Sequence, residues 1–131
     1  GRLDSIQVFG TDYPTPDGTC IRDYIHVDDL ASAHEKALKH LISGGQSDGW
    51  NLGTGNGFSV RAILEAVGTA MNSEVPFSEG PRRAGDPAIL VANSSKAKTE
   101  LGWEPVYQDV GKLVATAVAW HRNHPTGYSQ N

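Results

Sequence analysis

The sequence contains a single cysteine, Cys20, so its 131 residues cannot form an internal disulfide. A chain without disulfides suits a reducing compartment, and we expect a cytoplasmic protein. No apolar run approaches the ~20 residues that a membrane-spanning helix needs, and the first residues show no signal-peptide pattern. A net charge of -4 gives no basic surface for nucleic acid. With 38% hydrophobic residues, the composition is that of one globular domain with a hydrophobic core.

The chain also lacks the closely spaced groups that metal sites and acid/base catalysis require. Its five histidines are scattered, and His121 and His124 are better explained as solvated or capping residues at a helix end. Asp28 and Asp29 are adjacent and would diverge on a helix, which favours capping over a paired catalytic role. Cys20 is too isolated to be assigned as a nucleophile. The sequence therefore predicts no metal centre and no self-contained catalytic pair.

The glycine-rich stretch NLGTGNGFSV, residues 51–60, raises the question of a dinucleotide-binding loop. A G-x-G-x-x-G loop needs its third glycine three residues after the second, so that a helix packs closely on a strand. Counted from Gly53 and Gly55, that glycine falls at position 58, which is Phe58. We therefore interpret the stretch as the end of a strand and a glycine turn, after which Ser59 caps a helix.

The order of expected elements is that of an α/β protein with few and short strands. Alternation at Ile6 and Val8 predicts a strand, and residues 20–27 are expected to run extended. Residues 74–78 suit an edge strand because of Pro76. The chain is therefore a poor candidate for a complete doubly wound sheet, and several elements are expected to need a partner surface.

Four helices are expected along the chain. The first is capped by Asp28 or Asp29 and ends before Gly44. The others begin at Ser59, at Ser94 or Ser95, and at Asp109, with Gly102 closing the third and Trp103 packing back on it. The apolar residues expected on one inward face of the first helix are Leu30, Ala33, Ala37, Leu38, Leu41 and Ile42.

Three arginines, Arg22, Arg82 and Arg83, lie outside the expected helices. A guanidinium group stays charged and binds phosphate oxygens in pairs, so loop arginines that converge from two segments would suit a diphosphate. Ordinary surface ion pairs are the alternative, between Arg22 and Asp23 and between Arg83 and Asp86. Composition alone favours the ion pairs over a phosphate site.

A family resemblance is carried by residues 8–34, VFGTDYPTPDGTCIRDYIHVDDLASAH, and continues through NLGTGNGFSV, GPRRAGDPA, SSKA and ELGWEP to AWHRNHPTGY. These strings, in this order and spacing, resemble the UDP-glucose 4-epimerases (UDP-galactose 4-epimerases), members of the extended short-chain dehydrogenase/reductase superfamily. The resemblance covers nearly the whole chain. Related dehydratases, decarboxylases and sugar epimerases share only looser versions of the strings.

The resemblance implies a small C-terminal α/β domain that binds a UDP-sugar and occupies residues 1–131, with pieces that would complete the edge of a missing Rossmann domain. The family's G-x-x-G-x-x-G loop, catalytic Ser/Thr and Tyr-x-x-x-Lys pair have no counterpart, since no tyrosine here is followed by lysine four positions later. The family uses NAD, and we expect its site in an N-terminal catalytic domain upstream of Gly1. The implied partners are a UDP-hexose, that missing domain and a second copy of the chain.

The resemblance also assigns roles to individual residues. It implies that Arg22 and Arg83 bind the diphosphate, whereas composition alone favoured surface ion pairs for them. Arg82 is expected to have a structural role. Leu90 matches a position that walls the hexose pocket. Leucine is intermediate between the bulky residues that exclude N-acetylated sugars and the small ones that admit them, so acceptance of those sugars is left open. The implied substrate-binding residues are Gln7, Val8 and Phe9 for uracil, Arg22 and Arg83 for the diphosphate, Asp86 for the ribose hydroxyls, and Leu90.

The activity implied for the intact family enzyme is the interconversion of UDP-glucose and UDP-galactose in galactose metabolism. The hexose is oxidised at C4 with bound NAD, the 4-keto sugar rotates, and the hydride returns to the other face, with the tyrosine as general base. This chain would anchor UDP during the rotation and is expected to be inactive alone. Two alternatives stay open: a free-standing, non-catalytic nucleotide-sugar binding module, and part of another NAD-dependent nucleotide-sugar epimerase or dehydratase. The string TDYPTPDGTCIRDYIHV argues against the second.

Overall fold

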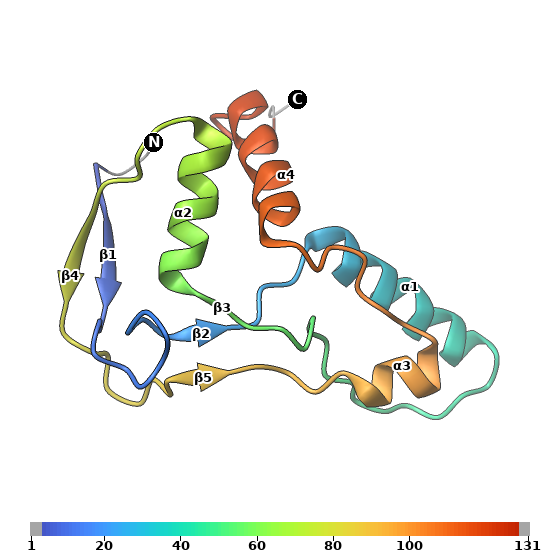
Figure 1. Cartoon of the computed structure of the whole chain (residues 1–131). Coiled ribbons are helices and arrows are strands. Elements are labelled where there is room, and N and C mark those ends of the chain that lie inside the picture. Colours follow the sequence, from blue (N-terminus) through green and yellow to red (C-terminus); the bar gives the residue numbers. More distant parts are fainter. Residues whose placement is uncertain (1–3, 129–131) are drawn as a thin grey trace.

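The computed structural model describes residues 4–128, which form a mixed α/β structure, as predicted (Figure 1). Gly1, upstream of which the cofactor loop is expected, lies outside this range. None of the helices in the described part of the chain is both long and apolar enough to cross a membrane. In chain order the elements are β1 (Ile6–Phe9), β2 (Ile21–Arg22), α1 (Val27–Ile42), β3 (Phe58–Ser59), α2 (Val60–Met71), β4 (Phe77–Gly80), β5 (Ile89–Leu90), α3 (Ser95–Leu101) and α4 (Val110–Asn123).

The strands form two small sheets, and no larger sheet joins them within residues 4–128. β1 pairs in parallel with β4 from Ile6↔Phe77 to Phe9↔Gly80. β2 lies between antiparallel β3 and parallel β5, and each of these three strands has two residues. The expectation of few, short strands is confirmed for this range. The strand predicted over residues 74–78 begins later, at Phe77, because Pro76 has no N–H and contributes only its carbonyl, to Ile6 N at 2.9 Å.

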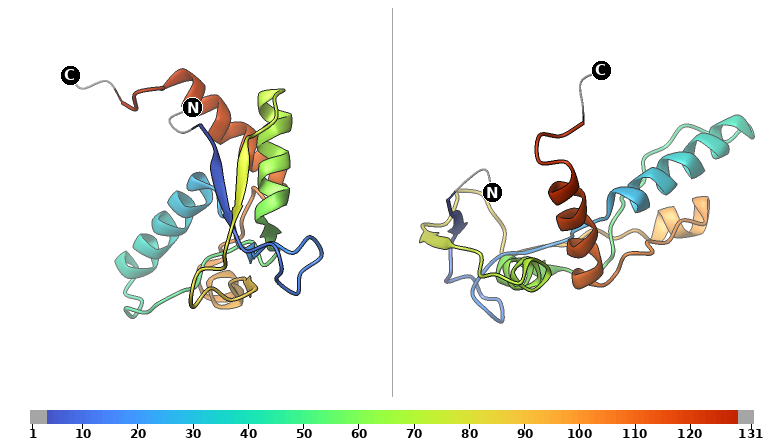
Figure 2. Two further views of the ribbon diagram at one scale, coloured as in Figure 1. Left: turned by 90° about the vertical axis from the view of Figure 1, so that its left-hand side faces the viewer. Right: turned by 90° about the horizontal axis from the view of Figure 1, so that it is seen from above.

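The helices lie in two places along an elongated molecule. α2 packs against α4 beside the β1–β4 pair, while α1 and α3 lie together at the other end (Figures 1 and 2). Trp103 is the centre of the α1–α3 contact: its side chain is 1% exposed and packs with Ala33 and Ala97. Gly102 closes α3 at φ 61°, and Trp103 N then donates to Ala97 O at 3.2 Å. The predicted packing of Trp103 back on this helix is confirmed.

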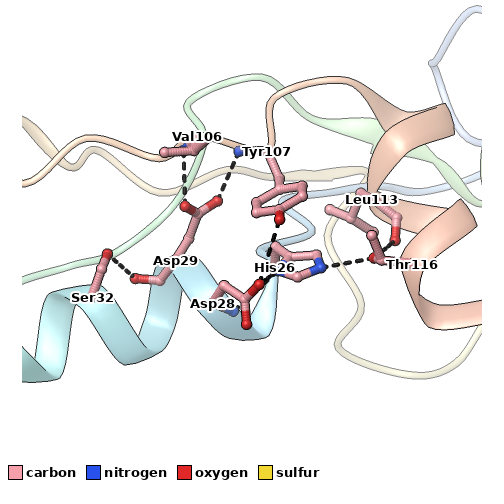
Figure 3. Close-up of polar contacts among 8 residues, drawn as sticks. All are labelled: His26, Asp28, Asp29, Ser32, Val106, Tyr107, Leu113 and Thr116. Atoms are coloured by element: carbon pink, nitrogen blue, oxygen red, sulfur yellow. Dashed lines mark hydrogen bonds and ion pairs between the residues drawn. The ribbon is translucent and has the colours of Figure 1, made fainter. Parts of the chain in front are cut away.

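The start of α1 differs from the prediction, since neither Asp28 nor Asp29 is its N-cap. His26 caps the helix, and its Nδ1 accepts a hydrogen bond from Asp28 N at 3.0 Å. Asp29 lies within the first turn, where its 2% exposed side chain faces the linker between α3 and α4. Its carboxylate accepts from Val106 N at 2.8 Å and Tyr107 N at 3.0 Å (Figure 3). The acid therefore holds a distant segment instead of its own helix end.

His26 links the same helix to α4. Because Nδ1 accepts from a backbone N–H, the proton is on Nε2, which donates to Thr116 Oγ1 at 2.7 Å (Figure 3). The imidazole also stacks on the Tyr107 ring, with 3.7 Å between centroids. The junction of α1, α4 and the α3–α4 linker is therefore fixed by polar and ring contacts around one buried histidine.

Several of the apolar residues predicted on the inward face of α1 are exposed, which corrects the prediction that the whole face points inward. Ala33 is buried against α3, whereas Leu38, Leu41 and Ile42 are exposed. At 100° per residue, Leu38 and Ile42 point roughly 140° and 180° away from Ala33, whereas Leu41 lies roughly 80° from it, so the exposed stripe runs beside and opposite Ala33. Exposed apolar stripes of this kind commonly mark a contact surface. Association with a second copy stays a prediction.

Asp17 joins the loop that follows β1 to the start of α2. Its carboxylate accepts from Thr19 N at 2.9 Å, from Thr19 Oγ1 at 2.7 Å and from the hydroxyl of Ser59. Ser59 is the N-cap of α2, as predicted, and its Oγ accepts from Ala62 N at 3.1 Å. Burial alone would raise the pKa of Asp17, but the hydrogen bonds from Ser59 and Thr19 outweigh it and lower that pKa.

Replacing Asp29 tests its hold on the linker. Asp29→Ala leaves the N–H groups of Val106 and Tyr107 without their carboxylate, so we expect a loss of about 2–4 kcal/mol in the free energy of unfolding. Asp28→Ala is the matched control, because the side chain of Asp28 is 68% exposed, and it should cost less than about 1 kcal/mol. Urea titration measures both. Equal losses in the two variants would contradict the assignment.

Asp17 should make stability depend on pH. Its lowered folded-state pKa means that its contribution is present above the ordinary value of 3.8 and is lost as the pH falls through the folded-state value. Asp17→Asn should therefore be less stable than the parent at neutral pH and should lose less of its stability in acid. Thermal unfolding between neutral and acid pH checks this, with the exposed Asp4→Asn as control. A parallel decline in parent and Asp17→Asn would refute it.

Candidate functional site

Five of the seven predicted substrate-binding residues are joined by direct contacts, and we call them the arginine cluster: Phe9, Arg22, Arg83, Asp86 and Leu90. The Arg83 guanidinium lies over the Phe9 ring at 3.8 Å from its centroid. Asp86 N donates to Arg83 O at 3.3 Å, and Asp86 Oδ1 lies 3.3 Å from Arg22 Nη2. Arg22 is paired with Leu90 between β2 and β5. Residues predicted from three separate parts of the sequence therefore lie at one location.

The backbone around the cluster explains why Arg22 is held there. Ile21 N donates to Ala88 O at 2.8 Å and so joins β2 to the chain entering β5. Arg22 Nη1 donates to Pro87 O at 2.9 Å and to its own neighbour Ile21 O at 2.8 Å. These carbonyls orient the guanidinium, whose side chain is 22% exposed. Arg22 is therefore fixed in direction while part of it still reaches solvent.

The alternative ion pairs considered for the arginines are wrong. Arg22 pairs with Asp86 and not with Asp23. Arg83 has no carboxylate within ion-pair distance in the described range, so the pair between Arg83 and Asp86 does not form. Its guanidinium rests instead on an aromatic ring, an arrangement that leaves the charge without an acidic partner.

Arg82 makes contacts within the fold, in line with the structural role expected for it. Its Nε donates to Asp12 Oδ1 at 2.7 Å, and its guanidinium lies 4.2 Å from the centroid of the Tyr13 ring. The hydrogen bond from Arg82 lowers the pKa of Asp12, and the same bond raises the pKa of Arg82. Neighbouring arginines thus have different environments: one is paired with an acid and the other is not.

The remaining predicted residues lie on β1. Val8 is 2% exposed, so its side chain belongs to the interior and only its peptide groups could meet a ligand. Gln7 is exposed and lies against Gly80 of β4, where an added Cβ would come within 2.8 Å of Gln7 Nε2. Glycine at position 80 therefore gives the Gln7 side chain its room.

The glycine-rich turn is closed by an internal carboxylate. Asp23 Oδ1 accepts from Thr54 N at 2.9 Å and Thr54 Oγ1 at 2.7 Å, and Oδ2 accepts from Gly55 N and from Ala92 N, each at 3.2 Å. A Cβ on Gly53 would lie 2.4 Å from Oδ2, so only glycine allows this approach. The N–H groups that a pyrophosphate would use are already occupied. This turn does not fit a dinucleotide.

The strand predicted to end at this turn does not form. Within the described residues, positions 50–57 have no regular secondary structure, and the nearest strand, β3, follows the glycines. Leu52 does not pair in a strand, and its side chain packs against the cluster of Ala33, Ala97 and Trp103. Sequence reasoning treated Asp23 only as an ion-pair partner and missed its central position. An acid next to a short strand gives no sequence signal that identifies its donors.

An open hollow of about 810 Å³ lies elsewhere, between α2 and β4. It contains none of the predicted site residues. Its arginine, Arg61, pairs with Glu79 at 3.4 Å, and Glu65 and Glu74 also line it. Acidic side chains, and an arginine that is already ion-paired, do not suit a diphosphate. The volume of this hollow therefore does not make it the candidate site. Within residues 4–128 no group of three histidine, cysteine or acidic side chains could hold a metal ion.

Comparison with curated proteins gives long matches at high identity. The UDP-glucose 4-epimerase of Lacticaseibacillus casei is 50% identical over 128 residues, which is 98% of this chain and 39% of the relative. The UDP-glucose 4-epimerase of Halalkalibacterium halodurans is 50% identical over 129 residues, with the same two coverages. The chain thus spans about two fifths of the length of these relatives.

Solved structures agree with the sequence matches. A crystal structure of UDP-glucose 4-epimerase superposes with a TM-score of 0.94 at 55% identity, covering 99% of this chain and 40% of that one. The Bifidobacterium longum enzyme, in complex with NAD+ and UDP, gives a TM-score of 0.86 at 40% identity, covering 98% of this chain and 38% of that one. The family model described as GDP-mannose 4,6 dehydratase matches residues 6–114. The chain therefore belongs to the GDP-mannose 4,6-dehydratase family of extended short-chain dehydrogenase/reductases, and among the members of that family it is similar to UDP-glucose 4-epimerases.

Proposed function

We propose that this chain is the C-terminal, UDP-sugar-binding part of a UDP-glucose 4-epimerase. It would hold the UDP group while the hexose turns, and a separate N-terminal domain would carry NAD and the catalytic residues. Two relatives with this name match 98% of the chain, and the related Bifidobacterium longum enzyme binds NAD+ and UDP. Because the glycine-rich turn is closed by Asp23, no step in the proposal uses a cofactor bound to this chain.

The observation that carries the proposal is the chain of contacts that joins Arg22 to Arg83 through Asp86. One arginine comes from β2 and pairs with Asp86, while the other comes from the segment before β5 and accepts from Asp86 N through its backbone carbonyl. A diphosphate carries negative charge on two neighbouring phosphates, and the planar guanidinium fork matches such oxygens. Arg83, which lacks an acidic partner in the described range, is the residue most ready to accept an anion.

The neighbouring groups suit the rest of a UDP molecule. Within residues 4–128 β1 is paired only with β4, so the peptide groups of its other edge can bind the uracil ring. Asp86 uses Oδ1 for Arg22, and its second oxygen can accept from a ribose hydroxyl. Leu90 is 59% exposed beside Arg22 and can contact the hexose.

The role proposed for the chain is anchoring without chemistry. A sugar that must present both faces to one hydride donor has to turn, so its fixed point must be elsewhere on the molecule. Contacts to UDP that persist through the reaction provide that fixed point. The arginines grip the charged diphosphate and leave the hexose free to rotate about its link to it.

The isolated 131-residue chain should not interconvert UDP-glucose and UDP-galactose, even with added NAD. It has no tyrosine followed four positions later by lysine, and its glycine turn does not fit a dinucleotide. A coupled assay on the purified chain checks this against a blank without protein. Turnover above the blank that persists through repurification would refute the proposal that NAD and the catalytic residues lie outside this chain.

Removing one of the two cluster arginines should weaken UDP binding. A suitable host is the Lacticaseibacillus casei enzyme with its matching segment replaced by this chain, since the two are 50% identical over 128 residues. Hydrogen bonds to charged groups are worth about 1.5–3 kcal/mol, so Arg22→Ala and Arg83→Ala should each cost about ten- to a hundredfold in affinity. Calorimetry with UDP measures this.

Arg82→Ala is the matched control for those titrations, because Arg82 is already paired with Asp12. It should lose little UDP affinity. Lysine in place of Arg22 should not restore binding, because an ammonium group lacks the planar fork. If all three alanine variants behave alike, or if Arg82 dominates, the proposed assignment of the diphosphate site is wrong.

A further inference from the structure

Asp23 connects three segments that are distant in the sequence. It directly follows β2, and its carboxylate bonds the glycine turn through Thr54 and Gly55. The same carboxylate bonds Ala92 N, two residues beyond the end of β5. Four donors on two oxygens fill the accepting capacity of a carboxylate. Asp23 is thus the common acceptor for the ends of two strands and one turn.

The geometry of Arg22 depends on the pairing that Asp23 extends. β2 and β5 have only two residues each, paired as Ile21↔Ile89 and Arg22↔Leu90. So short a ladder contributes few backbone hydrogen bonds and holds its register weakly. The bond from Ala92 N to Asp23 adds a further link just past the strand ends. It keeps Arg22 opposite Leu90 and next to Pro87 O and Asp86.

We propose that Asp23 is a positioning residue for the diphosphate site: by tying β5 and the glycine turn to the end of β2, it sets the direction of the Arg22 guanidinium. The inference rests on the proposed function. Asp23 itself touches no part of the substrate. Its effect passes through Arg22 and through the β5 segment that carries Asp86 and Leu90 toward the ligand.

The chemistry of the position requires a carboxylate of this length. An asparagine would turn an NH₂ group toward the N–H donors on one side of the site. A glutamate would bring its carboxylate farther into a space where the backbone at Gly53 already approaches within contact distance. Asp23→Asn therefore removes the accepting oxygen with almost no change in volume, and it is the variant to test.

The test compares UDP with uridine, which lacks the diphosphate. Both are titrated into the 131-residue chain and its variants, with amide NMR spectra reporting binding and folding together. In the parent chain UDP should bind more tightly than uridine. Asp23→Asn should reduce that preference about three- to tenfold, because Arg22 is loosened and not lost. Thr54→Val, which removes only one side-chain donor to Asp23, should reduce it by a smaller factor.

Asp17→Asn is the control for general destabilisation. Asp17 accepts three hydrogen bonds, against four for Asp23, but it joins the loop after β1 to α2 and not β2 to β5. It should leave the ratio of UDP to uridine affinity unchanged. A purely structural role for Asp23 would weaken both ligands equally and keep that ratio.

Arg22→Ala separates this inference from the proposed function. If Arg22→Ala abolishes the preference for UDP while Asp23→Asn keeps it, the diphosphate site stands and the positioning role is refuted. An equal reduction in Asp17→Asn and Asp23→Asn refutes it as well. If Arg22→Ala keeps the preference, the diphosphate site itself is wrongly assigned, and the role of Asp23 falls with it.

Discussion

The carboxylate of Asp23 is the interaction on which the arrangement of the arginine cluster depends. β2 and β5 are too short to define their own register, and the glycine turn has no strand to hold it. Thr54, Gly55 and Ala92 all donate to this one acid. The result is a fixed backbone around Arg22, which places the guanidinium between a carbonyl and Asp86.

Aspartate carboxylates that join distant segments occur at several places along the chain. Asp17, Asp23 and Asp29 each accept backbone hydrogen bonds, and each also joins its own segment to a residue at least 31 positions away in the sequence. A carboxylate accepts several such bonds at once, and bonds to a charged acceptor are stronger than neutral ones. A protein with small sheets and long connections can thus fix its loops by side chains. The arginine cluster lies next to the segments that Asp23 fixes.

Local signals in the sequence predicted much of the fold. The cap at Ser59, the closure of α3 at Gly102 and the return of Trp103 follow from residue types whose preferences act over a few positions. The first helix was harder. His26 is the N-cap, because the carboxylate of Asp29 instead accepts from a linker nearly eighty residues later in the chain. No local pattern in the sequence encodes that contact.

At the candidate site, too, some features could be expected from the sequence and others could not. A family resemblance drew attention to Arg22, Arg83 and Asp86, and the fold brings them together. Composition had suggested other ion pairs, because sequence neighbours such as Arg22 and Asp23 look like partners. In the fold the two side chains serve different purposes: Arg22 reaches Asp86, and Asp23 turns to the glycine loop. Only tertiary contacts distinguish these outcomes.

The most direct test of the central claim is a crystal structure of the chain with bound UDP. We expect the diphosphate to lie between the guanidinium groups of Arg22 and Arg83, with Ala92 N still bonded to Asp23. UDP seated in the hollow between α2 and β4, or phosphates bound to Arg82 in place of Asp12, would contradict it.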